Sequence, residues 1–361
     1  MFSEAVVGDP PPVVSTASVA VYARSVLERL QSLPQGNAHG VNAKLPGLSI
    51  RIRSFDDGMA EAARRNLVRF SGAVPFPTLE MTVSILHEGV PGSPAAARWS
   101  ASEPYMPHRV AETLDEADLR AEYHFELDHW HVCDPSLGIA AQMMRRPGLY
   151  PPWETGAPLR PFLHWHYARR GMRLTHGGTL GLDGKGVLLA GAGGSGKSGT
   201  VIAGLLNGLQ SVGDDYVLLN ADKGINAYPL YATLKQDPAG YERLGLGRLL
   251  PSGQGLNWQG KHQFLIGQIA PQGMPPSLEI GAMLVPHVAD ARRTTISAMP
   301  RAEAMMALAK SSIYQMPGER ESGFRFFSMV ARRLPCFRLD LGRQPAEITD
   351  TIGNFIGRLK Q

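Results

Sequence analysis

The sequence predicts an α/β fold for the larger, C-terminal part of this 361-residue chain. Three neighbouring segments support this prediction. Residues 187–190 form an apolar run as long as a buried strand, residues 191–198 are rich in glycine, and residues 201–209 carry apolar side chains at helical spacing. A strand that passes through a glycine loop into a helix is typical of α/β proteins. We therefore expect an α/β domain over residues 156–361, preceded by a smaller α+β domain over residues 1–150.

The composition excludes several classes of protein. Hydrophobic residues make up 43% of the chain and charged residues 19%, as in ordinary globular proteins. No apolar run reaches the roughly 18 residues of a membrane span, and the N-terminus lacks the layout of a signal peptide. We therefore expect a cytoplasmic protein without a membrane partner. The net charge of +4 is spread along the chain, which argues against a nucleic-acid partner. Cys133 and Cys336 provide no disulfide framework, and we expect both in the core.

Helix and strand patterns mix irregularly in the first 150 residues. We expect a loose arm over residues 1–16, helices over 18–33 and 57–70, and strands over 48–55, 79–86 and 123–132. The last strand includes or precedes several possible metal ligands: His124, Asp128, His129, His131, Cys133 and Asp134. Side chains alternate along a strand, so His129 and His131 share a face with Cys133, and Asp128 points away. Because this spacing matches no structural zinc motif, we interpret the segment as a strand ending in a turn, with a metal site as the alternative.

A hairpin precedes the glycine-rich loop. Residues 175–182 and 185–190 are two expected strands joined by Asp183-Gly184, a strong signal for a two-residue turn. Extending the register of this hairpin places His176 opposite Gly191. We therefore expect the histidine to lie beside the loop.

The loop itself, residues 191–198, matches the pattern G-x-x-x-x-G-K-[ST] at every fixed position. Its glycines let backbone N–H groups turn inward around a phosphate, and the following helix points its positive end at the same anion. Lys197, expected to be exposed, would reach the β- and γ-phosphates, and the Ser198 hydroxyl would ligate Mg²⁺. We therefore expect ATP and Mg²⁺ as cofactors. The predicted nucleotide-contacting residues are Gly191, Gly193, Gly194, Ser195, Gly196, Lys197, Ser198 and Gly199.

Two adjacent carboxylates, Asp214 and Asp215, follow a strand expected over residues 209–212, and a further strand is expected over 217–220. Such a pair within apolar sequence is costly to bury unless a metal ion or a positive charge accompanies it. In a nucleotide site Mg²⁺ supplies that charge, and one carboxylate is free to accept a proton from an attacking hydroxyl. A tight turn that exposes both carboxylates is the alternative.

The remaining segments complete the α/β pattern. We expect a proline-rich linker over residues 147–153, a helix over 159–172, a strand pair over 225–234, a long loop over 237–276, strands over 280–286, 294–298 and 336–341, and helices over 300–316, 321–334 and 345–359. Arg292 and Arg293 are weak candidates for phosphate contact, because arginine suits that contact but is usually just solvated on a strand edge.

The order His176-Gly177, glycine-rich loop and Asp214-Asp215, sixteen residues after Ser198, resembles the nucleotide-binding domain of HPr kinase/phosphorylase and related serine kinases. The resemblance covers about residues 155–235 well, and the C-terminal third only in general layout. It implies a fold like the nucleotide domain of phosphoenolpyruvate carboxykinase and phosphoryl transfer from ATP to a serine-type hydroxyl. It also implies that Lys197 and Ser198 bind nucleotide and Mg²⁺, that Asp214 is the base, and that Asp215 and His176 are its catalytic neighbours. We assign Asp215, with Ser198, to the metal.

The chain departs from that family in two respects. It lacks the glycine-rich signature that HPr kinases use near their protein substrate, and residues 1–150 do not resemble that family's N-terminal domain. We therefore expect an acceptor other than HPr, such as a serine in a protein or in a precursor peptide, for example that of a lasso peptide. A small-molecule kinase on the same scaffold and a nucleotide-sensing regulatory module are the alternatives, and an oligomer is compatible with the sequence.

Overall fold

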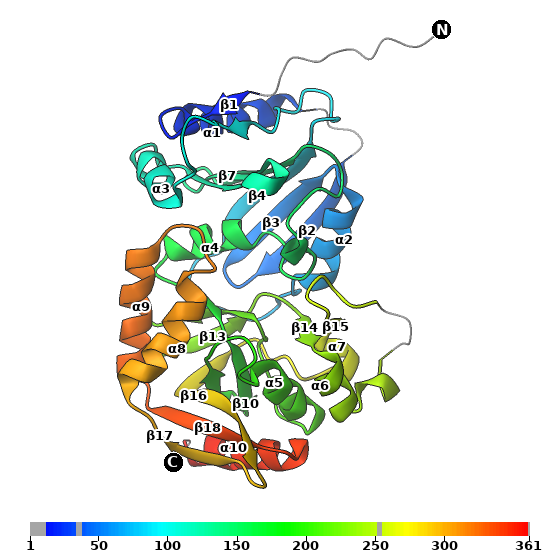
Figure 1. The fold of residues 1–361 in the computed structure, drawn as a ribbon, viewed down its shortest axis with the longest axis vertical. Coiled ribbons are helices and arrows are strands. Elements are labelled where there is room, and N and C mark those ends of the chain that lie inside the picture. Colours follow the sequence, from blue (N-terminus) through cyan, green and yellow to red (C-terminus); the bar gives the residue numbers. More distant parts are fainter. Residues whose placement is uncertain (1–11, 34–37, 251–254, 360–361) are drawn as a thin grey trace. The chain divides into compact units, whose positions relative to one another are not determined.

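The structure is a computed structural model that describes residues 12–33, 38–250 and 255–359, and the chain forms two units (Figure 1). Unit 1 contains residues 1–42, 51–61 and 80–151, and unit 2 contains residues 43–50, 62–79 and 152–361. Of the arm expected over residues 1–16, residues 1–11 lie outside the described part. No helix in the described part is both long enough and apolar enough to cross a bilayer.

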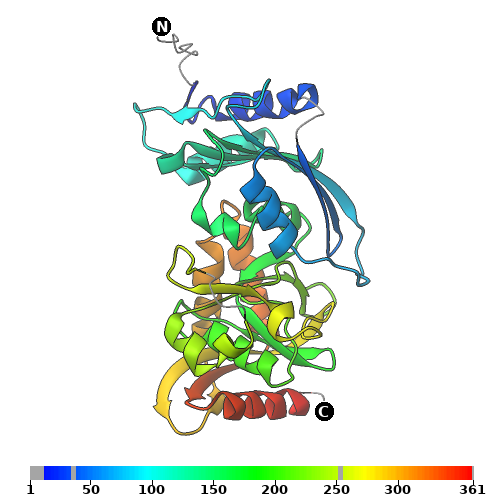
Figure 2. The ribbon, with the colours of Figure 1, turned by 90° about the vertical axis from the view of Figure 1, so that its right-hand side faces the viewer.

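A six-stranded sheet with the order β2-β3-β4-β8-β7-β6 organises the N-terminal part of the chain. Helix α1 lies across one face of this sheet (Figure 2), where Val26 shares a hydrophobic core with Trp130 of β7. The elements of this part are β1 (Val13–Val14), α1 (Val19–Arg29), β2 (His39–Leu45), β3 (Leu48–Ser54), α2 (Asp57–Asn66), β4 (Leu79–His87), β5 (Arg98–Trp99), α3 (Pro107–Glu116), β6 (Arg120–His124), β7 (His129–Asp134) and β8 (Ile139–Met144).

The single strand predicted over residues 123–132 is wrong, because this segment is the centre of a hairpin. β6 and β7 pair in antiparallel fashion, and a short 3-10 turn at Phe125–Leu127 joins them. Asp128 ends the turn with a φ of 46°, a left-handed conformation that Asp tolerates better than most residues. The turn contains no Gly, Pro or Asn, so nothing in the local sequence marks it. β8 is not predicted either, because its Ala, Gln and Met residues favour helices.

The main sheet of unit 2 has the order β10-β11-β16-β13-β12-β9, with β18 beside β16 and β17 beside β18. β16 pairs in parallel with both β11 and β18, as in the α/β class that the sequence predicts. The elements are α4 (Arg160–Ala168), β9 (Arg173–His176), β10 (Gly178–Leu182), β11 (Lys185–Leu189), α5 (Lys197–Leu206), β12 (Tyr216–Asn220), β13 (Asn226–Pro229), β14 (Thr233–Gln236), α6 (Pro238–Arg243), β15 (His262–Leu265), α7 (Ile266–Ile269), β16 (Leu278–Ala291), β17 (Thr295–Ala298), α8 (Arg301–Ile313), α9 (Arg320–Arg333), β18 (Cys336–Gly342) and α10 (Pro345–Arg358).

Hydrophobic cores on both faces of this sheet hold the helices. Leu188 of β11 belongs to the core that includes α8 and α9, while its neighbours Val187 and Leu189 belong to the core that includes α5 and α10. A strand buried on both faces is apolar throughout, which explains the uninterrupted run in the sequence. Cys133 and Cys336 are both buried, as predicted.

The predicted hairpin is confirmed, because β10 and β11 pair in the predicted register through a turn at Asp183-Gly184. From the turn, however, this pairing extends back only to Gly178. The preceding strand, β9, pairs with β12. His176 therefore lies opposite Tyr216, and the prediction that it lies opposite Gly191 is wrong. The chain changes partner at Gly177, which the hairpin register alone does not reveal.

Three further predictions for unit 2 are wrong. Residues 209–212 form no strand, only an isolated bridge between Gln210 and Gly181. The long loop expected over residues 237–276 contains α6, β15 and α7 in its described part. The strand pair expected over residues 225–234 is divided, because β13 joins the main sheet and β14 pairs with β15. These short elements are held by partners distant in sequence, so local patterns predict them poorly.

Candidate functional site

The glycine-rich loop connects β11 to α5 and confirms the strand, loop and helix order that the sequence predicts. Gly194 and Gly196 have φ angles of 81° and 100°, which side-chain-bearing residues rarely adopt. A Cβ atom at Gly196 would also lie 2.4 Å from the Leu341 side chain. Gly196 precedes the first residue of α5, so the loop leads directly into the positive end of that helix.

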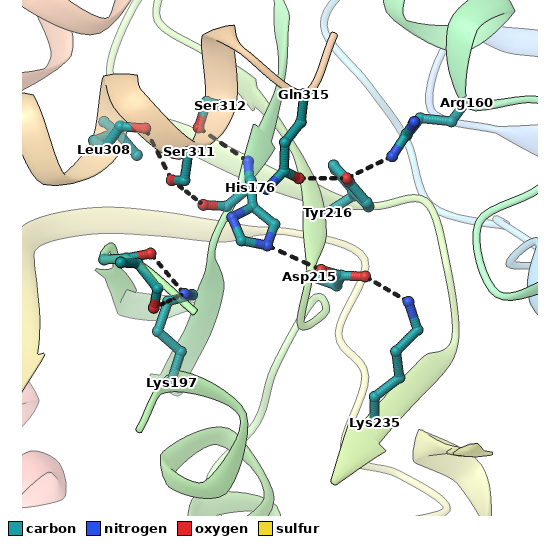
Figure 3. A network of polar contacts seen from close by, with 12 residues as sticks. Arg160, His176, Lys197, Asp215, Tyr216, Lys235, Leu308, Ser311, Ser312 and Gln315 are labelled. Carbon is teal, nitrogen blue, oxygen red and sulfur yellow. Dashed lines mark hydrogen bonds and ion pairs between the residues drawn. The ribbon is translucent and has the colours of Figure 1, made fainter. Parts of the chain in front are cut away.

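Lys197 is the first residue of α5 and is buried, contrary to the expected exposure. Its Nζ donates hydrogen bonds to the Gly191 carbonyl at 2.6 Å and to the Ala192 carbonyl at 3.0 Å (Figure 3). Burial lowers the pKa of the Lys197 ammonium, while Asp214 and Asp215 act in the opposite direction. The ammonium is thus held inside the loop.

Asp214 and Asp215 occupy a tight turn that leads into β12. The Tyr216 N–H donates to the Asp214 carbonyl at 3.0 Å, and Asp215 between them has a φ of 75°. A non-glycine residue in this conformation is strained, and such strain is often found at functional sites. The Gly177 N–H donates to the Asp215 carbonyl at 3.1 Å and helps to hold the turn. The turn gives two consecutive carboxylates different surroundings.

Both oxygens of the Asp215 carboxylate have partners. His176 Nε2 lies 3.0 Å from Oδ1, and Lys235 Nζ lies 2.8 Å from Oδ2 (Figure 3). Burial by itself raises the pKa of Asp215, but the Lys235 ammonium and the His176 imidazole outweigh it and hold the pKa well below its usual range. Asp215 is therefore ionised and fixed between two basic side chains.

Asp214 has the opposite environment. It is only 2% exposed, and its Oδ1 has no hydrogen-bond partner in the part of the chain that the structure describes. Burial and the neighbouring Asp215 raise the pKa of Asp214, against the hydrogen bond from Ser198 and the charges of Lys197 and His176. Asp214 is thus a better proton acceptor near neutral pH than an ordinary aspartate.

Helix α8 and strand β12 fix the position of His176. The His176 N–H donates to Ser312 Oγ at 3.1 Å, and the Ser311 hydroxyl donates to the His176 carbonyl at 3.4 Å (Figure 3). Tyr216, opposite His176, accepts a 2.7 Å hydrogen bond from Arg160 and donates a 2.6 Å one to Gln315. These contacts hold the backbone of His176, and its imidazole contacts the Asp215 carboxylate.

One cavity of about 780 Å³ brings these groups together within unit 2. Of the predicted site residues, its lining includes His176, Gly193, Gly194, Gly196, Lys197, Ser198, Gly199, Asp214 and Asp215. Gly191 and Ser195 do not line it, although Gly191 contributes the carbonyl that holds Lys197. Four further cations in the lining were not predicted: Lys235, Arg243, Lys261 and Arg343. Arg292 and Arg293 are exposed and do not line the cavity, so their candidacy is not supported.

A second cavity of about 540 Å³ also lies in unit 2, between residues 64–72 and segments near Pro229 and Pro275. Its lining contains no carboxylate, histidine or lysine. It therefore offers no acid or base, and the first cavity is the candidate active site.

Comparisons with known proteins assign this chain to no family. No protein-family profile matches the sequence, and no curated protein matches it. Among solved structures, the HPr(Ser) kinase/phosphatase from Coxiella burnetii is similar with a TM-score of 0.30 and 11% sequence identity, over 52% of this chain and 99% of that chain. The chain has a mixed α/β fold, and we base its function on the chemistry of its own site.

Proposed function

We propose that this chain is an ATP-dependent kinase that transfers a phosphoryl group to a hydroxyl, namely a serine of a peptide or protein. The observation that supports the proposal is the cavity bordered by Lys197, Ser198, His176 and the pair Asp214-Asp215. Phosphoryl transfer depends mainly on positioning and on neutralising phosphate charge. This cavity combines a cationic side chain, a helix N-terminus and a proton acceptor, which are the groups that the reaction requires.

The glycine-rich loop would bind the nucleotide as a P-loop. The positive φ angles of Gly194 and Gly196 allow successive N–H groups to face one anion. Lys197 would exchange its two loop carbonyls for phosphate oxygens, which accept hydrogen bonds from an ammonium more strongly because they are charged. No other described residue is hydrogen-bonded to the Lys197 ammonium, so this exchange breaks contacts only within the loop.

Ser198 and Asp214 fit a magnesium ion at the phosphates. The Ser198 hydroxyl donates to the buried Asp214 carboxylate, which orients the hydroxyl oxygen as a ligand. When bound, Mg²⁺ would neutralise charge on the transferred phosphoryl group. The predicted metal ligand Asp215 already holds His176 and Lys235, so an ion would compete with two cations there. We therefore propose that Asp215 positions these two side chains.

Asp214 is the proposed proton acceptor. Its Oδ1 has no hydrogen-bond partner in the described residues, and its raised pKa favours proton uptake. A hydroxyl bound next to Asp214 would lose its proton to this oxygen as it attacks the γ-phosphorus. The bond from the γ-phosphorus to the oxygen that bridges it to the β-phosphate would break, and ADP would leave.

The test incubates the full chain with Mg²⁺ and γ-labelled ATP. Three parallel reactions contain a mixture of serine peptides, a mixture of small hydroxyl metabolites, or no acceptor. We expect a labelled phosphoserine product with peptides, and at least about 100-fold slower formation of it by the variant Lys197→Met. Labelled metabolites without labelled peptide would identify a small-molecule kinase. Nucleotide binding without transfer to any hydroxyl would support a sensor, and a chain that binds no nucleotide would contradict the whole proposal.

A further inference from the structure

A cluster of three histidines and one glutamate lies in unit 1, on the hairpin that the sequence does not predict. In the antiparallel register of β6 and β7, Glu122 lies opposite His131, and His124 lies opposite His129. Residues two apart on a strand share a face, and so do directly opposed residues. The four side chains therefore form a two-by-two block on one face of the sheet. The other face carries Trp130, which packs in the core with α1.

The distances within this block match those of a metal site. The ligand atoms of Glu122, His124 and His131 all lie within 4.8 Å of one another. Glu122 Oε2 is 3.4 Å from His124 Nε2 and 3.6 Å from His131 Nδ1. Ligands at zinc distances of about 2.0–2.1 Å in a tetrahedron lie about 3.3–3.4 Å apart. A single ion could therefore contact all three residues after small side-chain adjustments.

His129 provides a second, independent observation. It is completely buried, and its ring centroid lies 4.8 Å from that of His131 and 5.7 Å from that of His124. Its Nδ1 faces the Leu149 carbonyl at 3.5 Å, and its Nε2 has no hydrogen-bond partner among the described residues. A buried imidazole without such a partner is costly, and an ion or its bound water would satisfy it.

We propose that Glu122, His124 and His131 bind one Zn²⁺ ion, with His129 beside its fourth position. Two imidazoles and one carboxylate form a ligand set that zinc prefers, and it leaves a coordination site for water or for the fourth side chain. Mg²⁺ and Ca²⁺ instead require mainly oxygen ligands. The ion would tie β6 to β7 across their turn. This site is separate from the proposed kinase site, because all four residues belong to unit 1 and the kinase residues to unit 2.

The experiment measures zinc binding to the full chain, freed of any histidine tag and first stripped with a chelator. Calorimetric titration with Zn²⁺ in excess Mg²⁺ should show one site per chain, and Zn²⁺ should raise the melting temperature. Substitution by Co²⁺ should give the intense visible bands of four-coordinate cobalt. Glu122→Gln, His124→Ala and His131→Ala should each weaken binding by at least about 100-fold, and His129→Ala by about 10- to 100-fold. His108→Ala, an exposed histidine of α3, is the matched control and should bind as the wild type does.

Circular dichroism of the zinc-free variants separates lost ligands from lost folding. Because Glu122→Gln preserves the side chain's shape, it tests the site even where a histidine variant misfolds. Lys197→Met should retain zinc binding, which keeps this test independent of the proposed kinase activity. A wild-type chain that shows no saturable Zn²⁺ binding would overturn the proposal. So would folded Glu122→Gln and His124→Ala variants that bind zinc with wild-type affinity.

Discussion

The polar groups of the two units are buried in different ways. In unit 2, Asp215 lies between His176 and Lys235, and Lys197 lies inside a glycine-rich loop at a helix N-terminus. Backbone N–H groups and cations there favour an anion such as a triphosphate. In unit 1, the hairpin block combines imidazoles with a carboxylate, all of which have lone pairs to offer a cation. The comparison shows that the arrangement of donors and acceptors, more than burial itself, determines which ligand a polar site can accept.

The largest effect is expected from removing Asp214, the proposed proton acceptor in unit 2. Asp214→Asn preserves shape but cannot take up the acceptor's proton, so the rate of transfer should fall by about 10²–10⁴-fold. ATP affinity should change much less, because the loop provides most of it. Steady-state transfer to the acceptor found in the screen, beside ATP binding by calorimetry, measures both quantities. Wild-type transfer by Asp214→Asn would remove Asp214 from the chemistry.

Removing the cation of the loop should also be severe. Lys197→Met is expected to lower the transfer rate by about 10²–10³-fold, because one charged stabiliser of the transition state is lost. The variant should retain its fold, since within the described part of the chain the ammonium is hydrogen-bonded to two carbonyls of its own loop. Transfer assays and circular dichroism test these two statements. Lys185→Met, which removes a partly exposed lysine paired with Glu279, is the control and should leave the rate unchanged.

The contacts of Asp215 distinguish a positioning role from metal binding. If Asp215 positions Lys235 and His176, then Lys235→Met and Asp215→Asn should slow transfer by similar factors, about 10- to 100-fold, without changing the Mg²⁺ concentration for half-maximal rate. If Asp215 binds the metal, as the sequence predicts, only Asp215→Asn should raise that concentration. A Mg²⁺ titration of the rate for both variants separates the two cases.

The two aspartates should affect stability in opposite directions. The raised pKa of Asp214 means that the folded state loses stability as pH rises above the ordinary value of 3.8, so Asp214→Asn should raise the melting temperature at pH 7. The lowered pKa of Asp215 stabilises the fold above that value, and this contribution disappears as pH falls below it. Asp215→Asn should therefore lower the melting temperature at pH 7. Each kcal/mol of change in the free energy of unfolding should shift the melting temperature by about 2–4 °C. Thermal melts without metal or nucleotide should show the Asp214→Asn difference shrinking as pH falls from 7 toward 4, and the Asp215→Asn difference shrinking only below about pH 4.

The smallest effect is expected from a change in the hydrogen-bond network around Tyr216, the residue opposite His176. Tyr216→Phe removes the hydroxyl that joins Arg160 to Gln315 and should cost about 1 kcal/mol of unfolding free energy. Tyr314→Phe, at an exposed position, is the matched control and should cost less than about 0.5 kcal/mol. Urea denaturation measures both, and equal stabilities would show that this network does not support the site.

Much of the site in unit 2 could be predicted because it is local in sequence. The strand, the glycine-rich loop and helix α5 are consecutive, and the hairpin turn at Asp183-Gly184 fixes its own register. The roles of Lys197, Ser198 and the paired aspartates follow from the same stretch and stay predictions until they are tested. The ion pair of Lys235 with Asp215 could not be predicted from local sequence. Lys235 lies on β14, which pairs with β15, a strand in the segment predicted to be a long loop.

Elements could be predicted where their signals lie within a few residues: apolar periodicity, glycine positions and a two-residue turn. Which strands become neighbours depends instead on contacts between distant parts of the chain. His176 pairs with β12 and not with β11, because the chain changes strand partner at Gly177. The histidine segment forms a hairpin in which Glu122 lies opposite His131. The physical reason is that strand pairing depends on partners distant in the chain and on turns without special residues. The groups that meet across such pairs therefore leave no local pattern.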